Sequence, residues 1–517
     1  MALTRQQYKA FEAIVGPENI SDDPVDLDAW AWRSGQAAMA QDFVPRFEAV
    51  LMPGSTEEVQ AIVRLCNKYG IQFKASSTGW GCYCDLREVR PPGCIKLDMR
   101  RMNRILEINE ENMYAVVEPY VIHAQLQAEL MKRGFHCNVN GAGGVTSAMP
   151  LAAHEGIGHM SCSCGISERN QLALEWVTPK GDIIRLGSLG SLGEWFCGDG
   201  PGPSLRGIVR GNVTPLGGLG VYTKAAVKIY HWPGPPTMEV KGASPHYIAK
   251  NPGNFLLRYL SWPDEDGRQA GIQKLTESEI CLGIMGFNAN MVACNVATNN
   301  EEELVLAEQY SKEIVGPGIC LVIAGNSPRD FEYKKRVLEE IIKETGATSL
   351  KAVEEGDVHD AFIWRFIRVT ASIRETMRAT GVFGGEVFGT DSYRIMRNAV
   401  QHSRIDKKDL IDRGLVLPDN TDPFITSLEQ GQLTHSEVLL RWKPDPEVAQ
   451  AAMEYVQKAN EATVKGHHGL PHHLWSDAMH DFFGPHACNY TYWLRKIKKL
   501  YDPNGVSESS HHISAKD

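Results

Sequence analysis

The chain has 517 residues, with 53 Lys and Arg side chains against 63 Asp and Glu, which gives a formal net charge of −10. This acidic excess opposes electrostatic capture by nucleic acid or anionic lipid. The composition, 43% hydrophobic and 22% charged, is that of a globular protein of two or three domains and excludes wholesale disorder.

Targeting signals and disulfides are not indicated by the sequence. No stretch reaches the roughly 18 consecutive apolar residues that a membrane-spanning helix requires, and residues 1–15 lack the apolar core of a signal peptide. The 12 cysteines are scattered along the chain, which favours reduced thiols over a disulfide framework. We therefore expect a cytoplasmic protein without a membrane span.

The segment after residue 43 predicts a strand, a helix and a second strand. An apolar run at 49–52 is followed by a capping box that begins at Ser55, at the head of an apolar helical stripe. Gly70 marks the end of this helix, and the alternating strand 71–75 leads into a loop of small residues, 76–81.

The rest of the first domain mixes short strands and helices. The patterns predict strands at 114–118 and 225–230, a helix at 121–133 and a hairpin over 172–186. The proline-dense segment 232–236 cannot continue a sheet or a helix. The fold class is therefore α+β, and we place the end of the first domain at residue 236.

The middle of the chain contains longer helices, such as 301–314 and 329–345, which alternate with strand-like runs. A helix at 447–462, a histidine-rich patch and a basic helix at 492–500 follow, and the tail 507–517 is expected to fray. The predicted organisation has four parts: an N-terminal helical segment at 1–42, the first domain at 43–236, a substrate or cap domain at 237–446, and a C-terminal segment at 447–517.

The loop 76–81 suits an anion, because small residues let backbone N–H groups approach a diphosphate closely. By itself, the same loop is more typical of an ordinary tight turn in an α+β protein. The Gly-x-Gly-x-x-Gly and Gly-Lys-Ser/Thr fingerprints are absent, which disfavours a nicotinamide or ATP site.

The order of the segments is more specific than the loop. The loop is followed by motifs at 95–105, 115–119, 143–148, 155–158, 179–182, 205–208 and 219–224. In this order they resemble the FAD-binding domain of the vanillyl-alcohol oxidase and p-cresol methylhydroxylase superfamily. The resemblance implies a PCMH-type FAD-binding domain of two subdomains, a cap domain with an antiparallel sheet flanked by helices, and a C-terminal segment that returns to the FAD-binding domain.

The same resemblance implies the residues that hold FAD. The diphosphate is assigned to Ser76, Ser77, Thr78, Gly79, Trp80 and Gly81. The ribityl and ring portions are assigned to Ser147, Gly156, Gly158, Gly220 and Val221. The Arg-x-Gly-Gly-His string of the bicovalent oxidases is missing, so we expect noncovalent FAD. Cys82, Cys84, Cys162 and Cys164 lie near these segments, where buried or free thiols are favoured over a metal or cluster site.

Histidines in the C-terminal part of the chain are the catalytic candidates: His468, with His467 and His435 as its neighbours at the reacting face. Residues 463–469 resemble the histidine motif of D-lactate dehydrogenases and glycolate oxidase subunits, which implies that His467 and His468 lie near the flavin, where imidazole can act as a base. The metal-binding branch carries a His-x-Gly-Asp-Gly-Asn-x-His element, which is absent here. Its nearest counterpart places His435 and Glu437 on one face of a strand. These two residues could join His468 around a metal ion, but solvated polar groups are the favoured reading, and no metal site is predicted.

The resemblance implies an FAD-dependent dehydrogenase that oxidises a hydroxylated small molecule, with a 2-hydroxy acid favoured, by hydride transfer to the flavin. No second redox centre is evident, so the electrons are expected to pass to an electron-transferring flavoprotein or an iron–sulfur subunit. The alternatives are an aromatic alcohol or phenol oxidoreductase, a non-redox flavin-dependent synthase and a flavin-bearing electron-transfer subunit. A homo-oligomer is compatible with the sequence.

Overall fold

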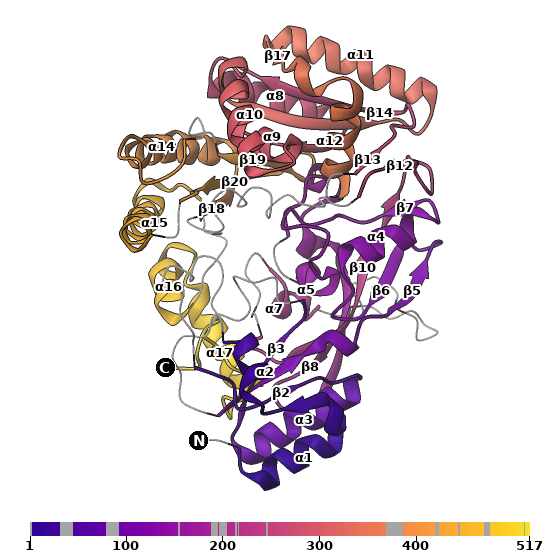
Figure 1. The fold of residues 1–517 in the computed structure, drawn as a ribbon. Coiled ribbons are helices and arrows are strands. Elements are labelled where there is room, and N and C mark those ends of the chain that lie inside the picture. The colour runs from indigo at the N-terminus through magenta and orange to yellow at the C-terminus, as the bar shows by residue number, and fades with distance from the viewer. Residues whose placement is uncertain are drawn as a thin grey trace.

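The computed structural model describes residues 3–31, 45–78, 93–153, 156–187, 195, 204–211, 215, 217–243, 247–368, 386–418, 423–442, 445–469, 476–510 and 512–516. Figure 1 shows the N-terminal elements in the lower half of the molecule and the elements from the middle of the chain in the upper half. The last two helices, α16 (Ser476–Phe483) and α17 (Tyr490–Tyr501), return to the lower half.

The first subdomain is a small sheet covered by helices. Its elements are α1 (Arg5–Val15), β1 (Ile20–Ser21), α2 (Pro24–Ala29), β2 (Val50–Leu51), α3 (Thr56–Tyr69), β3 (Gln72–Ser76) and β4 (Cys94–Asp98). The sheet order is β1-β2-β4-β3, with β2 and β3 parallel to β4. The predicted helix start and stop are confirmed, because Ser55 Oγ accepts a hydrogen bond from Glu58 N and Gly70 ends α3 at a φ of 65°. The loop predicted to meet a diphosphate therefore leaves β3, the last strand in this order.

The second subdomain is an antiparallel sheet of order β5-β6-β10-β8-β9. Its elements are β5 (Ile105–Asn109), β6 (Tyr114–Val117), α4 (His123–Met131), β7 (Phe135–His136), α5 (Ala148–Ala153), α6 (Ser161–Cys164), β8 (Gln171–Val177), β9 (Ile183–Leu186), α7 (Arg206–Val209), β10 (Val221–Lys228) and β11 (Tyr230–His231). Residues of α4 and α5 share one buried apolar cluster with strands of this sheet. The sheet thereby supports the segments between α4 and α6.

The cap begins with the hairpin β12 (Val240–Lys241) and β13 (Ile248–Ala249). Its other elements are β14 (Phe255–Ser261), α8 (Glu265–Glu277), β15 (Cys281–Met285), α9 (Ala289–Val296), α10 (Asn300–Glu313), β16 (Gly318–Ala324), α11 (Pro328–Thr345), β17 (Thr348–Ser349), α12 (Gly356–Arg368), β18 (Glu386–Asp391), α14 (Tyr393–Asp412), β19 (Phe424–Leu428) and β20 (Leu433–Leu439).

Two antiparallel sheets meet edge to edge in the cap. Their orders are β15-β16-β14-β17 and β18-β20-β19. They join where Gly286 N donates to Ile425 O and Thr426 Oγ1 donates to Ile284 O at 2.7 Å. Helices pack beside this sheet, as α14 does on β18 and β20. The cap therefore has the antiparallel, helix-flanked form that the sequence predicts, and β20 lies in its interior.

The C-terminal tail does not fray where the sequence predicts that it would. Phe73 N donates to Val506 O at 2.9 Å and Glu508 N donates to Phe73 O at 3.0 Å, so the tail extends the first sheet beside β3. The prediction failed because polar residues dominate this stretch, whereas a non-local partner strand buries them: Glu508 is 0% exposed.

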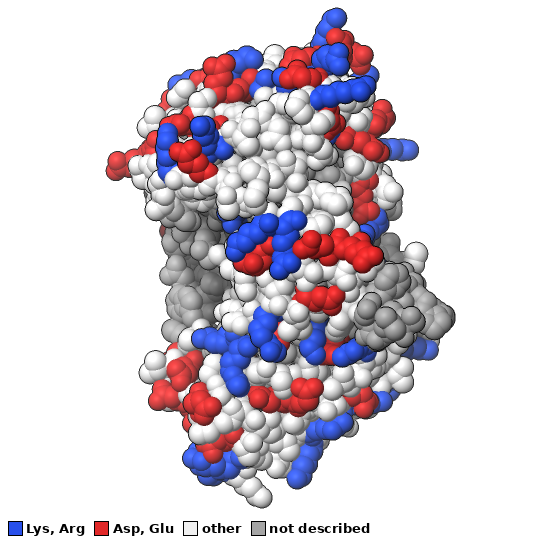
Figure 2. All heavy atoms as spheres, turned by 90° about the vertical axis from the view of Figure 1, so that its right-hand side faces the viewer, with Lys and Arg blue, Asp and Glu red and all other residues white. Residues whose placement is uncertain are grey.

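On the face shown in Figure 2, Lys and Arg side chains are interspersed with Asp and Glu, with no continuous basic track among the described residues. None of the helices in the described part of the chain combines the length and apolar content needed to cross a bilayer.

Candidate functional site

The structure brings together two of the segments predicted to hold FAD. The loop after β3 starts at Ser76, and Thr78 N donates to Ser147 Oγ at 3.3 Å. Ser147 Oγ in turn donates to Thr78 Oγ1 at 3.1 Å. Because 69 residues separate the two partners in sequence, the fold, and not the local chain, makes this contact. Ser77 directly precedes Thr78 in the described part of the loop, whereas Gly79, Trp80 and Gly81 lie outside the described residues.

Ser76 has the environment expected of a ligand-binding hydroxyl. Its side chain is 7% exposed, and Oγ has no hydrogen-bond partner among the described residues. Buried polar atoms in folded proteins are almost always hydrogen-bonded, so an orphaned hydroxyl at this position fits contact with a bound polar group. The donor-rich loop is consistent with the FAD diphosphate.

Gly156 and Gly158 are required by close packing of the chain. A Cβ atom at Gly158 would lie 2.2 Å from Val139 O, and one at Gly156 would lie 2.2 Å from Ser167 Oγ. Ser167 Oγ donates to Gly156 O at 2.5 Å. The segment therefore lies flat against residues 138–140, a position that only glycine permits.

The third predicted segment forms the turn before β10. Gly220 has a φ of 85°, and a Cβ atom there would lie 2.3 Å from Val177 O. Gly220 N donates to Ser507 Oγ at 2.7 Å. Val221 is 3% exposed and pairs with Val177. The turn is therefore fixed by β8 on one side and by the C-terminal tail on the other.

Substitution of Gly220 with Ala is expected to reduce the free energy of unfolding by about 1–3 kcal/mol, because the positive φ and the backbone clash both oppose a Cβ atom. FAD affinity should fall with it. The matched control is Gly207→Ala in α7, where a Cβ atom would meet nothing within 4 Å. Urea titration and FAD titration of both variants test this. Equal behaviour of the two variants would contradict it.

His435 and Glu437 form a hydrogen-bonded pair on β20. Nε2 of His435 lies 2.8 Å from Glu437 Oε1, and Nδ1 lies 3.1 Å from Thr390 Oγ1 on the neighbouring strand β18. The His435 side chain is 0% exposed and that of Glu437 is 16% exposed. Both ring nitrogens are thus engaged, and the carboxylate is the solvent-accessible end of the pair.

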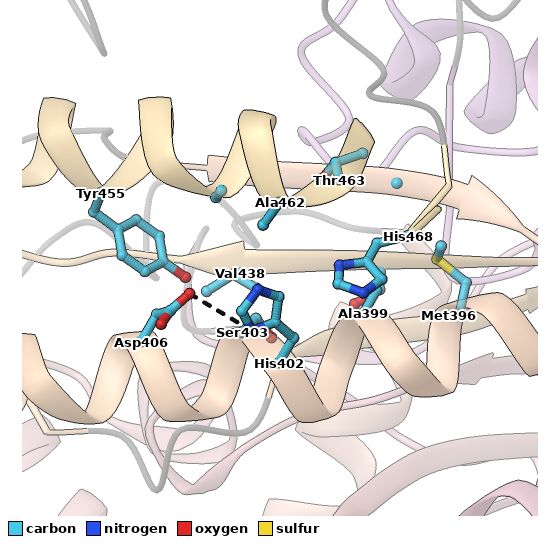
Figure 3. Close-up of a pocket in the computed structure, with 13 residues that line it drawn as sticks. Met396, Ala399, His402, Ser403, Asp406, Val438, Tyr455, Ala462, Thr463 and His468 are labelled. Carbon is cyan, nitrogen blue, oxygen red and sulfur yellow. Dashed lines mark ion pairs between the residues drawn. The ribbon is translucent and has the colours of Figure 1, made fainter. Parts of the chain in front are cut away.

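His468 lies in a different place. It follows the end of α15 (Pro446–Gly466), where His467 adopts a φ of 53° and is exposed. His468 reaches into a cavity of about 40 Å³ between α14, α15 and β20 (Figure 3). Its ring centroid is 5.0 Å from that of His402. Partial burial and the neighbouring His402 and His467 lower the pKa of His468.

The cap sheet separates the predicted catalytic histidines. Ser436 and Val438 line the cavity of His468, and side chains alternate along a strand, so His435 and Glu437 point to the opposite face. On that opposite face, Leu428 of β19 packs with Ile157 and Ile166 of the predicted FAD-binding domain. The structure therefore brings His435 and Glu437, and not His468, to the side of the cap that meets this domain. The three residues do not converge on one metal ion.

His159 is a candidate site residue that the sequence reasoning missed. It is 1% exposed, and its Nδ1 lies 2.9 Å from Phe366 O at the end of α12. Its ring packs on Phe366 and Phe287 of the cap, with centroid distances of 4.6 and 5.6 Å. Burial lowers its pKa to about 4, despite the Phe366 hydrogen bond. Its position directly after Gly158 was the available signal.

The cysteines near the predicted FAD segments are buried thiols where the structure describes them. Burial raises the pKa of both Cys162 and Cys164 to about 12, which keeps them as thiols. Among the described residues, no group of three or more His, Cys, Asp or Glu side chains could hold a metal ion. Cys82 and Cys84 lie outside the described residues.

Comparison with known protein families identifies the cofactor. An FAD binding domain model matches residues 47–187. The 1'-carboxy-chondrochloren decarboxylase of Chondromyces crocatus is 29% identical over 42% of this chain and 39% of that protein. The glycolate oxidase subunit GlcD of Bacillus subtilis is 27% identical over 44% of this chain and 45% of its own length. For the 4-cresol dehydrogenase [hydroxylating] flavoprotein subunit of Pseudomonas putida, the identity is 26% over 38% of each chain.

Solved structures extend the likeness in fold to the cap. p-Cresol methylhydroxylase with substrate bound aligns with a TM-score of 0.77 and 16% identity, over 100% of this chain and 98% of that one. Alkyldihydroxyacetonephosphate synthase aligns with a TM-score of 0.64 and 15% identity, over 98% and 84%. The sequence matches span less than half the length of the relatives named above. Together, the ordered FAD segments, the matched domain and these relatives support the resemblance to the vanillyl-alcohol oxidase and p-cresol methylhydroxylase superfamily and show FAD as the cofactor.

Proposed function

We propose that the protein is an FAD-dependent dehydrogenase that oxidises a hydroxylated small molecule, with a 2-hydroxy acid favoured. Relatives named as a glycolate oxidase subunit, a D-lactate dehydrogenase and a D-2-hydroxyglutarate dehydrogenase support this class of substrate. Bound FAD would accept the hydride, and the protein would supply orientation and proton transfer. The residues that would hold FAD are those of the loop after β3, with Ser147 and the turn at Gly220.

The observation that carries the proposal is the Glu437–His435 pair. Both ring nitrogens of His435 are occupied, so His435 acts as a positioning residue that orients the Glu437 carboxylate. Glu437 keeps partial exposure on the face of the cap that meets the FAD-binding domain. A carboxylate in that position is suited to accept the hydroxyl proton of the substrate. His468 is the second candidate for this role and is supported by the resemblance of residues 463–469.

Anaerobic mixing of the purified flavoprotein with a substrate panel tests the function. The panel contains 2-hydroxy acids, benzylic alcohols and 4-alkylphenols. Bleaching of the flavin by a 2-hydroxy acid is the expected result. Reduction only by a phenol would favour the aromatic alternative, which the 4-cresol dehydrogenase relative supports. A yellow protein that no compound reduces would favour the synthase or electron-transfer alternative.

The electron acceptor is expected to be another protein. Two of the relatives are named as subunits, which supports a redox partner such as an electron-transferring flavoprotein or an iron–sulfur subunit. Substrate-reduced protein should then reoxidise slowly in air and quickly with an artificial dye. Stopped-flow measurement of flavin absorbance checks both rates. Fast reoxidation by air with stoichiometric peroxide would identify an oxidase instead.

A further inference from the structure

The hairpin of β19 and β20 contacts the FAD-binding domain at its tip. The tip is the 3₁₀ turn η6 (Glu429–Gly431), which packs beside α6 of that domain. Glu429 Oε1 accepts a hydrogen bond from Ile166 N at 3.3 Å, and its Oε2 accepts one from the Arg169 guanidinium. The same guanidinium donates to Gln432 Oε1 at 3.3 Å. We define these contacts of Arg169, Glu429 and Gln432 as the interdomain clasp.

The backbone of the hairpin tip is strained. Glu429 and Gln430 have φ values of 50° and 55°, in the left-handed region that non-glycine residues rarely adopt. Such conformations persist where the surrounding contacts fix them, and they are frequent at clamps and switch regions. The clasp supplies contacts of this kind, because the Glu429 side chain is 16% exposed and lies against the FAD-binding domain.

The segment that Glu429 contacts is firmly attached within the FAD-binding domain. Asn170 Nδ2 donates to Ile166 O at 3.0 Å. In the next residue, Ser167 N and Ser167 Oγ both donate to Gly156 O, at 3.0 and 2.5 Å. Gly156 belongs to the segments assigned to the ribityl and ring portions of FAD. The clasp therefore joins the cap hairpin to a segment expected to lie beside the flavin.

On the cap side, the clasp lies at the end of the strand that bears the proposed base. The strands β19 and β20 pair continuously from Leu428 with Leu433 to Phe424 with Glu437. Glu437 is four residues beyond Leu433, or about 13 Å at the rise of a strand. A displacement of the hairpin tip would therefore change where the Glu437 carboxylate lies. A misplacement of about 1 Å can lower a reaction rate by about 10²-fold.

Another part of the cap sheet is attached to the FAD-binding domain through β15. Ser163 Oγ donates to Leu282 O at 2.6 Å, and Ile284 N donates to His159 O at 3.1 Å. These contacts do not involve Arg169. Loss of the clasp should therefore loosen the hairpin without separating the cap from the FAD-binding domain.

We propose that Arg169 and Glu429 are positioning residues that hold the β19–β20 hairpin against the FAD-binding domain, so that the Glu437 carboxylate keeps its place at the reacting face. The two residues act through the hairpin and not by contact with the substrate. This inference rests on the proposed function, because it concerns the proton transfer assigned to Glu437. Arg169 is 47% exposed, and an ion pair with such a partner contributes little to folding stability. The expected effect is therefore on the reaction rate and on the hairpin.

Anaerobic flavin reduction by substrate, followed by rapid mixing, tests the role in the reaction. Arg169→Ala and Glu429→Ala should each lower the limiting reduction rate by about tenfold, because the base is displaced, while the Kd for FAD stays unchanged. Arg169→Lys, which keeps a cation, should recover part of the loss. Because both residues act through one contact, the double variant should lose no more than Glu429→Ala alone.

The matched control is Arg133→Ala. The Arg133 side chain is 49% exposed, and its ion pair with Glu110 lies within the FAD-binding domain, so the reduction rate should equal that of the wild type. Wild-type rates in both Arg169→Ala and Glu429→Ala overturn the proposal. Losses that multiply in the double variant also overturn it.

Hydrogen exchange of the amides of residues 424–439 tests the clasp independently of the reaction. Exchange should rise in Arg169→Ala and Glu429→Ala but not in Arg133→Ala, with unfolding temperatures close to that of the wild type in all three. Unchanged exchange in both clasp variants overturns the proposal. If Glu429→Ala does not fold, Arg169→Ala and Arg169→Lys decide alone. If the wild-type protein reduces no substrate, the dehydrogenase proposal fails, while the exchange still shows whether the clasp holds the hairpin.

Discussion

Replacement of Glu437 with Gln is expected to slow flavin reduction by substrate by about 10²–10⁴-fold, the usual contribution of a general base, while FAD stays bound. The amide retains the shape of the carboxylate and its contact with His435, but it cannot accept a proton. Rapid-mixing measurement of flavin absorbance under anaerobic conditions gives the reduction rate, and the visible spectrum confirms that the cofactor is present.

Three further variants decide between the two candidate bases. His435→Gln should give a smaller loss than Glu437→Gln, because it disturbs only the orientation of the carboxylate. Ser436→Ala is the matched control, since Ser436 lies on the same strand and faces the cavity of His468. If His468→Ala abolishes reduction while Glu437→Gln does not, the assignment implied by the sequence resemblance is right and the Glu437 assignment is wrong.

Local signals made the first subdomain predictable. The helix α3 follows from a serine cap, an apolar stripe and a terminal glycine, all within 16 residues of sequence, and the structure shows each of these features. The FAD segments were predicted for a different reason, namely their order. Individual contacts, such as that of Thr78 with Ser147, could not be predicted from the sequence, because they depend on how the two subdomains pack.

The position of the catalytic candidates was less predictable, because the elements that pack on a sheet determine which face of a strand meets the neighbouring domain. The alternation along 433–438 places His435 and Glu437 together, but it does not say which face meets the FAD-binding domain. The helices α14 and α15 determine the face, because they pack on the side of the strand that bears Val438. The side that bears His435 and Glu437 is left to meet the FAD-binding domain. The sequence analysis placed His468 beside His435, because no local sequence pattern shows that a β-sheet separates the two side chains.

The burial of the C-terminal tail could also not be predicted from local sequence, because its stabilising partners are distant in the chain. Its polar residues predict exposure, whereas the structure buries Glu508 beside Lys74 in a strand pairing that spans more than 430 positions of the sequence. A buried carboxylate is tolerated only with a cation and further hydrogen bonds, which here come from Lys74 and Ser510. Neither partner could be identified from local sequence.

Replacement of Glu508 with Ala is therefore expected to reduce the free energy of unfolding by about 3–5 kcal/mol, because it removes the carboxylate that pairs with the buried Lys74 ammonium. The double variant Lys74→Met with Glu508→Leu, which removes both charges, should lie much closer to the wild type. Glu344→Ala is the matched surface control. It breaks the exposed pair with Lys274 and should leave the free energy of unfolding close to that of the wild type. Urea titration measures all three.

The loss of unfolding free energy caused by Glu508→Ala should also depend on pH, and it should be smaller in acid. Burial alone would raise the pKa of Glu508, but Lys74 and the Ser510 hydrogen bonds lower it to about 2. In the unfolded chain a glutamate titrates near pH 4.3, so the folded state favours the ionised form. The stabilisation is thus fully present above that pH and is lost as the pH falls toward 2. The difference in unfolding free energy between wild type and Glu508→Ala should accordingly shrink between pH 5 and pH 3, whereas a difference that stays constant over this range would contradict the ionised pair.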